Sequence, residues 1–131
     1  MLSVVEVEHG GHDPVSVETI ELSVVIPACN EETRIGSTLE ATRAFLNDLG
    51  IRYEVIVVDD GSRDATRQVV SLTIGDWPQA RLLSYRLNRG KGHALRTGIA
   101  ATLGRRVLFM DADLSTPLVE IPRAIEYLDR G

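Results

Sequence analysis

Short apolar runs that alternate with helical patterns constrain the fold of this chain more than any other feature. The runs predict strands over residues 22–26, 53–58, 81–85 and 106–110. Apolar residues at helical spacing predict helices over residues 33–49, 64–74 and 94–103, and another from Pro117 onward. Strands that alternate with helices form right-handed crossover units and a mostly parallel sheet. The fold class predicted is therefore α/β, a mostly parallel sheet with flanking helices.

Composition narrows the class of protein. The chain has 131 residues, enough for one domain, with 14 Lys and Arg against 19 Asp and Glu and a net charge of −5. This balance argues against nonspecific nucleic-acid binding. Cys29 is the single cysteine, which excludes an internal disulfide and a thiolate zinc site.

Targeting signals are also absent from the sequence pattern. No apolar run approaches the ~18–20 residues of a transmembrane helix, and the N-terminus lacks the pattern of a signal peptide. We expect a cytoplasmic location, with the inner face of the membrane as an alternative. Residues 1–20 carry glycines and a proline without a sustained period, so we expect a flexible tail there and one domain over residues 21–131.

Two carboxylates stand at the end of the last predicted strand. Asp111 and Asp113 are separated by one residue and follow an apolar run directly. They repel each other unless a cation lies beside them, and closely spaced oxygen ligands suit Mg²⁺ or Mn²⁺ that keeps open positions for a phosphate-bearing substrate. The alternative is that Asp113 only caps the helix that follows.

Polar loops follow the other predicted strands. In parallel α/β sheets, ligands bind beyond the carboxyl ends of the strands, which gathers residues 27–31, 59–62, 88–93 and 111–113 on one edge. Carboxylates and basic side chains then face one crevice: Glu31, Asp60, Asp111 and Asp113 with Lys91 and Arg96. Stability alone gives little reason to place so many charges together. We therefore expect a binding site at this edge.

Two of these loops also have simpler interpretations. The segment 59–62 contains an Asp-Gly pair, which is common in turns. The segment Gly90–Gly92 matches neither the dinucleotide fingerprint nor the P-loop. A flexible turn is the simpler interpretation of this segment. A lysine and backbone amides at a helix start nevertheless suit a diphosphate.

Taken together, residues 22–31, 57–62, 88–92 and 111–117 resemble the motifs of family 2 glycosyltransferases of the GT-A fold. The resemblance covers about residues 21–131. The Asp-Ala-Asp-Leu sequence followed by a proline is most similar to the polyprenyl-phosphate sugar transferases, especially the dolichyl-phosphate β-glucosyltransferase-like branch. It implies the Rossmann-like nucleotide-binding half of a GT-A domain, incomplete in this chain.

The resemblance also implies roles for individual residues. The first and second strands would supply the nucleotide pocket and the contacts to the base, and the last strand would supply the metal and diphosphate motif. The residues expected to bind the nucleotide sugar are Pro27, Ala28, Glu31, Val58, Asp60, Lys91, Arg96, Asp111 and Ala112, and the expected metal ligands are Asp111 and Asp113. Cys29 replaces the aromatic residue common at that place. No catalytic base is identified.

The implied reaction is a metal-dependent, inverting sugar transfer from a nucleoside-diphosphate sugar of the UDP-glucose or GDP-mannose type to a polyprenyl phosphate. Mg²⁺ or Mn²⁺ would neutralise the departing diphosphate, with help from Lys91 or Arg96. A lipid phosphate is already anionic near pH 7, whereas a saccharide hydroxyl needs a general base. One predicted helix follows Asp113, so we expect the nucleotide-sugar half of a transferase, weak or inactive in turnover alone.

Three alternatives remain at this point. One is a nucleotide-sugar-binding module without turnover, and another is a family 2 transferase with a saccharide acceptor. The third is a phosphoacceptor signalling domain, which has a similar length and clustered aspartates. Such a domain carries its acidic pair after the first strand and a lysine after a fifth, whereas the acidic residues here follow the second and fourth predicted strands.

Overall fold

The computed structural model describes residues 3–6, 19–114 and 118–129. Within these residues the strands form one sheet in the order β1-β5-β2-β3-β4. The strands are β1 (Ser3–Glu6), β2 (Leu22–Ala28), β3 (Tyr53–Asp60), β4 (Ala80–Tyr85) and β5 (Arg106–Phe109). The last four are parallel in their pairings, and β1 pairs antiparallel with β5. The predicted α/β class and the mostly parallel sheet are confirmed.

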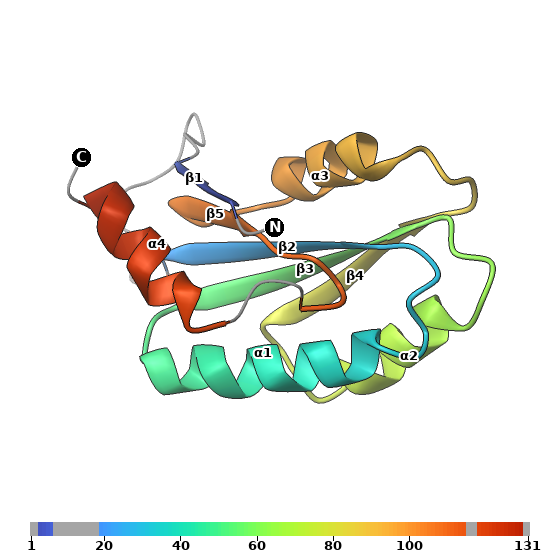
Figure 1. The fold of residues 1–131 in the computed structure, drawn as a ribbon, viewed down its shortest axis with the longest axis horizontal. Helices are drawn as coiled ribbons and strands as arrows, with labels where there is room; N and C mark the ends of the chain where they lie inside the picture. Colours follow the sequence, from blue (N-terminus) through green and yellow to red (C-terminus); the bar gives the residue numbers. More distant parts are fainter. Residues whose placement is uncertain (1–2, 7–18, 115–117, 130–131) are drawn as a thin grey trace.

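Helices cover both faces of the sheet. They are α1 (Ile35–Leu49), α2 (Thr66–Thr73), α3 (Lys91–Ala100) and α4 (Glu120–Asp129). Figure 1 shows α1 and α2 along one side of the sheet and α3 along the other, with α4 near β1. Pro122 is the third residue of α4, within the first turn, where its missing N–H costs no helical hydrogen bond. No helix in the described part of the chain is long and apolar enough to span a membrane.

The two central strands, β2 and β3, are buried on both faces. Val24 and Ile26 belong to the cluster that contains α1 and α2 residues, whereas Val25 packs with Ala94 of α3. This alternation follows from the two-residue period of a strand. It explains why β2 and β3 are almost continuously apolar, as expected for strands covered on both sides.

The N-terminal segment corrects one prediction. A flexible tail was expected over residues 1–20, yet Ser3–Glu6 forms β1, with Ser3 opposite Phe109 and Glu6 opposite Arg106. Backbone hydrogen bonds to β5 hold this segment. Such bonds do not depend on the side chains, and four residues are too few to show a periodic pattern in the sequence. The rest of the expected tail, apart from residues 19 and 20, lies outside the described residues.

Strand and helix boundaries differ at the edge that carries the polar loops. β2 continues through Pro27 to Ala28 because its pairing with β3 extends to Ala28 and Asp59, although its pairing with β5 stops at Val25 and Phe109. α3 begins at Lys91 rather than at residue 94. Several residues predicted in loops are therefore fixed at a strand end or a helix start.

Candidate functional site

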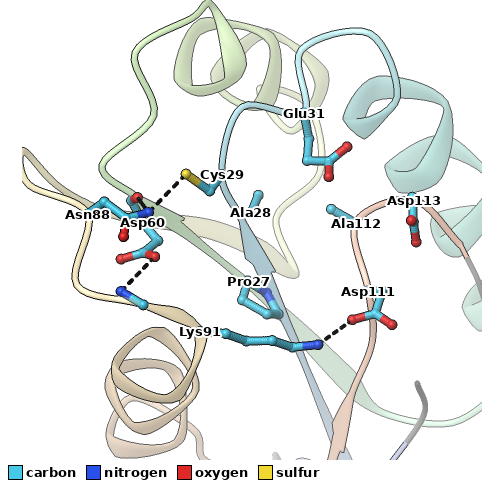
Figure 2. A pocket seen from close by; sticks show the side chains of 11 residues that line it. Pro27, Ala28, Cys29, Glu31, Asp60, Asn88, Lys91, Asp111, Ala112 and Asp113 are labelled. Atoms are coloured by element: carbon cyan, nitrogen blue, oxygen red, sulfur yellow. Dashed lines mark hydrogen bonds and ion pairs between the residues drawn. The ribbon is translucent and has the colours of Figure 1, made fainter.

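A pocket of about 330 Å³ opens at the carboxyl ends of β2, β3 and β5. Segments far apart in the sequence form its walls, as Figure 2 shows. The lining residues are Pro27, Ala28, Cys29, Glu31, Asp60, Asn88, Gly90, Lys91, Asp111, Ala112 and Asp113. Asp60 and Asp113 thus face one cavity, as expected from the rule that ligands bind beyond the carboxyl ends of parallel strands.

Most predicted site residues lie in this pocket. The lining includes every residue predicted to bind the nucleotide sugar except Val58 and Arg96, and it includes both predicted metal ligands. The Val58 side chain is fully buried in the cluster under α3. Arg96 is exposed on α3, one turn from Gly92. Neither side chain lines the cavity.

Asp60 anchors the glycine-rich loop to the end of β3. Its Oδ1 accepts hydrogen bonds from the Tyr85 hydroxyl at 2.6 Å and from the Arg89 N–H at 2.8 Å, and its Oδ2 accepts one from the Gly90 N–H at 3.1 Å. The Asp60 residue is only 4% exposed. Burial and the adjacent Asp60 carboxylate raise the pKa of Tyr85, which keeps its hydroxyl protonated as a donor.

The neighbouring Asp59 does not line the pocket. Its Oδ1 accepts a 3.1 Å hydrogen bond from the Ser62 N–H, three residues further along the chain, and so stabilises the turn after β3. Gly61 follows with a φ of +65°, and a Cβ there would lie 2.3 Å from the backbone nitrogen of Asn88. Only glycine permits this close approach of the two loops. Of the acidic pair, Asp60 is therefore the member that reaches the cavity.

Reciprocal hydrogen bonds join the loop after β2 to the loop after β3. The N–H of Asn30 donates to the Ser62 hydroxyl, and the Asn30 side chain accepts from the Arg63 N–H. The Glu31 N–H donates to the Thr66 hydroxyl at 2.8 Å. These contacts fix the backbone of Glu31 at the wall of the pocket.

Asp64 takes part in the same junction and accepts hydrogen bonds from Thr66 and from the N–H of Glu32. Desolvation opposes ionisation, but these hydrogen bonds outweigh it and lower the pKa of Asp64. The carboxylate form of Asp64 is thus the form that joins the two loops.

The predicted metal ligands lie on a tight turn after β5. The Leu114 N–H donates to the Asp111 carbonyl, and Leu114 has a φ of +55°, a conformation that is uncommon for leucine. The Thr38 hydroxyl of α1 donates a 2.6 Å hydrogen bond to the Ala112 carbonyl between the two aspartates. Helix α1 therefore positions this acidic turn.

Cationic side chains accompany both aspartates. Lys91 Nζ lies 2.7 Å from Oδ1 of Asp111, and Figure 2 shows its side chain extending from the start of α3 to that carboxylate. Arg34 Nη1 lies 3.9 Å from Oδ2 of Asp113. The carboxylates are 22% and 37% exposed, respectively, so both are open to solvent at the pocket.

The donor set fits a hard divalent cation. The described residues contain no group of three or more His, Cys, Asp and Glu arranged to hold a metal. Asp111 and Asp113 provide carboxylate oxygens on the cavity wall, which suits Mg²⁺ or Mn²⁺ that completes its coordination with water and substrate phosphates. Residues 115–117 of the acidic motif lie outside the described residues.

Several residues at or near the pocket were not predicted as site residues. Asn88 Nδ2 donates to Cys29 Sγ at 3.1 Å and to the Asp60 carbonyl at 3.2 Å, so it ties the glycine-rich loop to two strand ends. Tyr85 supports Asp60 from β4, and Arg34 contacts Glu31. Asn88 stands beside the basic loop in the sequence, whereas the positions of Tyr85 and Arg34 depend on tertiary contacts.

This mostly parallel sheet, with acidic strand ends and a basic loop around one pocket, has the fold of solved GT-A glycosyltransferases. Among solved structures, a mannosyltransferase from Pyrobaculum calidifontis in complex with GDP-Man and Mn²⁺ superposes with a TM-score of 0.64 at 29% identity. That match covers 79% of this chain and 31% of the mannosyltransferase.

The family is shown by sequence. The Glycosyl transferase family 2 model matches residues 23–131, and the chain belongs to that family. The dolichyl-phosphate β-glucosyltransferase of Dictyostelium discoideum is 38% identical over 121 residues, which are 87% of this chain and 37% of the relative. The undecaprenyl-phosphate 4-deoxy-4-formamido-L-arabinose transferase of Pectobacterium atrosepticum is 38% identical over 84% of this chain and 34% of its own length.

These matches confirm the predicted resemblance and remove the phosphoacceptor alternative. The chain spans about a third of the length of these curated relatives.

Proposed function

We propose that this chain binds a nucleoside-diphosphate sugar with Mg²⁺ or Mn²⁺ in the pocket at the carboxyl ends of β2, β3 and β5. The observation that carries the proposal is the convergence of Asp60, Lys91, Asp111 and Asp113 on one cavity. The mannosyltransferase that holds GDP-Man and Mn²⁺ shares this fold and supports the proposal. The nucleotide is of the UDP-glucose or GDP-mannose type.

Each group has a distinct task in this proposal. Asp111 and Asp113 would hold the divalent cation, which supplies neutralising charge for the departing diphosphate. Lys91, at the start of α3, presents an ammonium group and the nearby backbone amides to the phosphates. Asp60 keeps the glycine-rich loop in position and contacts the base, and Pro27 and Ala28 form the wall against the nucleoside, with Val58 buried behind this wall.

The reaction proposed for the whole protein is transfer of the sugar to a polyprenyl phosphate. An acceptor phosphate oxygen forms a bond to the anomeric carbon as the bond from that carbon to the diphosphate oxygen breaks, so the nucleoside diphosphate leaves and the configuration inverts. A phosphate acceptor is anionic near neutral pH and needs no carboxylate base. The names of the two curated relatives support this acceptor class, and the membrane surface is then the place of action.

Two alternative functions differ from this reaction, one by having no transfer step and the other by its acceptor. A binding module would hold the nucleotide sugar without transferring it, and a saccharide acceptor would require a general base that no assigned residue provides. Turnover assays with a polyprenyl phosphate and with an oligosaccharide distinguish these outcomes from the proposed reaction.

The experiment that tests the site is calorimetric titration with UDP-glucose and with GDP-mannose, with and without Mn²⁺. Asp113→Asn removes the negative charge of one proposed metal ligand, and we expect metal-dependent affinity to fall about tenfold or more, as for loss of a charge-assisted contact. Asp76→Asn is the matched control because Asp76 pairs with Arg43 on the surface, away from the pocket lining. Equal affinities for Asp113→Asn and the unaltered protein would contradict the metal assignment.

A further inference from the structure

Arg34 immediately precedes α1 and carries a guanidinium between two carboxylates of the pocket wall. Its Nε lies 2.8 Å and its Nη2 2.7 Å from Oε2 of Glu31, and its Nη1 lies 3.9 Å from Oδ2 of Asp113. The Arg34 side chain is 57% exposed, so part of the guanidinium remains accessible from solvent. One cation therefore connects the wall formed by the loop after β2 with the wall formed by the turn after β5.

The charges of the pocket lining explain why such a cation matters. The lining contains four carboxylates, those of Glu31, Asp60, Asp111 and Asp113, and one cationic side chain, that of Lys91. With Lys91 and one divalent cation counted, the lining still has a net negative charge, which disfavours the binding of an anionic diphosphate. When the positive charge of Arg34 is added, the net charge of these groups is zero. An acidic pocket can then accept the diphosphate of a nucleotide without a charge penalty.

The geometry also limits how far Arg34 can move. Two of its nitrogens share one oxygen of Glu31, and the backbone of Glu31 is fixed by its hydrogen bond to Thr66. The guanidinium is thus held beside Glu31 and Asp113 of the pocket lining, while Nη1, at 3.9 Å from Oδ2 of Asp113, makes only a loose ion pair. A fork of N–H donors in this position suits phosphate oxygens better than a single ammonium does.

We propose that Arg34 is a second phosphate-binding cation of this site, acting with Lys91 on the diphosphate of the nucleotide. The proposal rests on the proposed function, because it names a further residue of the same nucleotide site. Glu31 orients Arg34, and a divalent cation on Asp113 leaves Nη1 to donate to a phosphate oxygen. The specific alternative is that Arg34 only forms a surface ion pair three residues from Glu31.

The chain offers a matched control for that alternative. Arg123 Nη1 lies 3.6 Å from Oε2 of Glu120, also three residues away, and the Arg123 side chain is 80% exposed on α4. Arg34→Gln and Arg123→Gln therefore remove the same charge and the same type of ion pair. They differ in whether the guanidinium lies beside the pocket.

The experiment measures binding of UDP and of GDP by calorimetry in saturating Mn²⁺, and binding of Mn²⁺ alone, for the unaltered chain and these variants. We expect Arg34→Gln to lower the affinity for UDP or GDP, whichever binds more tightly, by about five- to tenfold, the scale of one charge-assisted hydrogen bond. Arg34→Lys, which retains the charge without the fork, should lose part of this affinity. Arg123→Gln should bind within about twofold of the unaltered chain.

Mn²⁺ alone separates a phosphate contact from a general loss of the site. Arg34→Gln should bind Mn²⁺ as tightly as the unaltered chain or more tightly, because a positive charge beside Asp113 has been removed. Equal diphosphate affinities for Arg34→Gln and Arg123→Gln would overturn the role of Arg34 while leaving the proposed function intact. No Mn²⁺-dependent binding of UDP or GDP by the unaltered chain would overturn both. If Arg34→Gln does not fold, undiminished binding by Arg34→Lys decides against the fork.

Discussion

The hydroxyl of Tyr85 donates a 2.6 Å hydrogen bond to Oδ1 of Asp60, so a residue of β4 orients the carboxylate that lines the pocket from the end of β3. The ring of Tyr85 also packs edge-on against His93 of α3, with the ring centroids 5.3 Å apart. Tyr85 therefore connects the strand end, the glycine-rich loop and the helix that follows it. Its protonation state links the stability of this edge of the sheet to pH.

The first prediction concerns stability at alkaline pH. The pKa of Tyr85 is raised by burial and by Asp60, whereas an unfolded tyrosine titrates near its ordinary value of 10.0. The unfolded state thus loses its proton first as pH rises. The stabilising contribution is fully present below about pH 10 and is lost progressively above it.

Tyr85→Phe should remove this part of the pH dependence. Urea unfolding at pH 8 and at pH 10.5 measures the change in free energy for the unaltered chain and for the variant. Because a change of pH also acts on other parts of the chain, the informative quantity is the difference in the free energy of unfolding between the two chains. A loss of stability between the two pH values that is the same in both would show that Tyr85 does not titrate as described.

The second prediction concerns the three donors that converge on Asp60. Asp60→Asn replaces one acceptor oxygen by an N–H₂ group, which then faces a backbone N–H or the Tyr85 hydroxyl. Hydrogen bonds to a buried charged group each contribute about 1.5–3 kcal/mol, so we expect a loss of about 2 kcal/mol in the free energy of unfolding.

Urea unfolding measures this loss, and Asp48→Asn provides the control because Asp48 is exposed on α1. Its stability should stay within about 0.5 kcal/mol of the unaltered chain. We also expect Asp60→Asn to weaken Mn²⁺-dependent nucleotide binding, since the glycine-rich loop loses its anchor. Full stability in Asp60→Asn would mean that the loop is held by other contacts.

The sequence predicted the parallel sheet and the shared edge because the signals are local. Apolar runs mark β2 and β3, and the connection rule for parallel sheets places their ends together without knowledge of side-chain contacts. Residues such as Asp60 and Asp113 could be placed from their position after a strand alone.

The remaining features depend on partners that are distant in the chain. Strand β1 exists through backbone pairing with β5, about a hundred residues away, and its four residues carry no period of their own. Arg34 and Tyr85 reach the site through side-chain contacts across loops and strands. Val58 was placed at the site by resemblance, and Arg96 both by resemblance and by its position after a basic loop at the same edge. The pleat of β3 turns Val58 under α3, and the helical period turns Arg96 outward.

The last prediction concerns the contact that sets the distance between α3 and the sheet, and with it the position of Lys91. A Cβ on Gly98 would lie 2.4 Å from Cγ1 of Val25 and 3.2 Å from Cγ2 of Val58, so α3 packs on the sheet through a glycine. Overpacking of this kind costs about 1–3 kcal/mol, and the higher helix propensity of alanine returns at most about 1 kcal/mol. We expect Gly98→Ala to lose about 1–2 kcal/mol in urea unfolding.

Gly92→Ala on the same helix is the matched control. A Cβ on Gly92 would meet only the Arg96 guanidinium, at 3.5 Å, so this variant should be as stable as the unaltered chain or gain up to about 1 kcal/mol. Because displacement of α3 also moves Lys91 away from Asp111, Gly98→Ala should in addition bind Mn²⁺ and nucleotide more weakly. Equal stabilities for the two variants would show that α3 can shift on β2 and β3 without a cost in the free energy of unfolding. The position of Lys91 would then depend on its ion pair with Asp111 rather than on the packing of its helix.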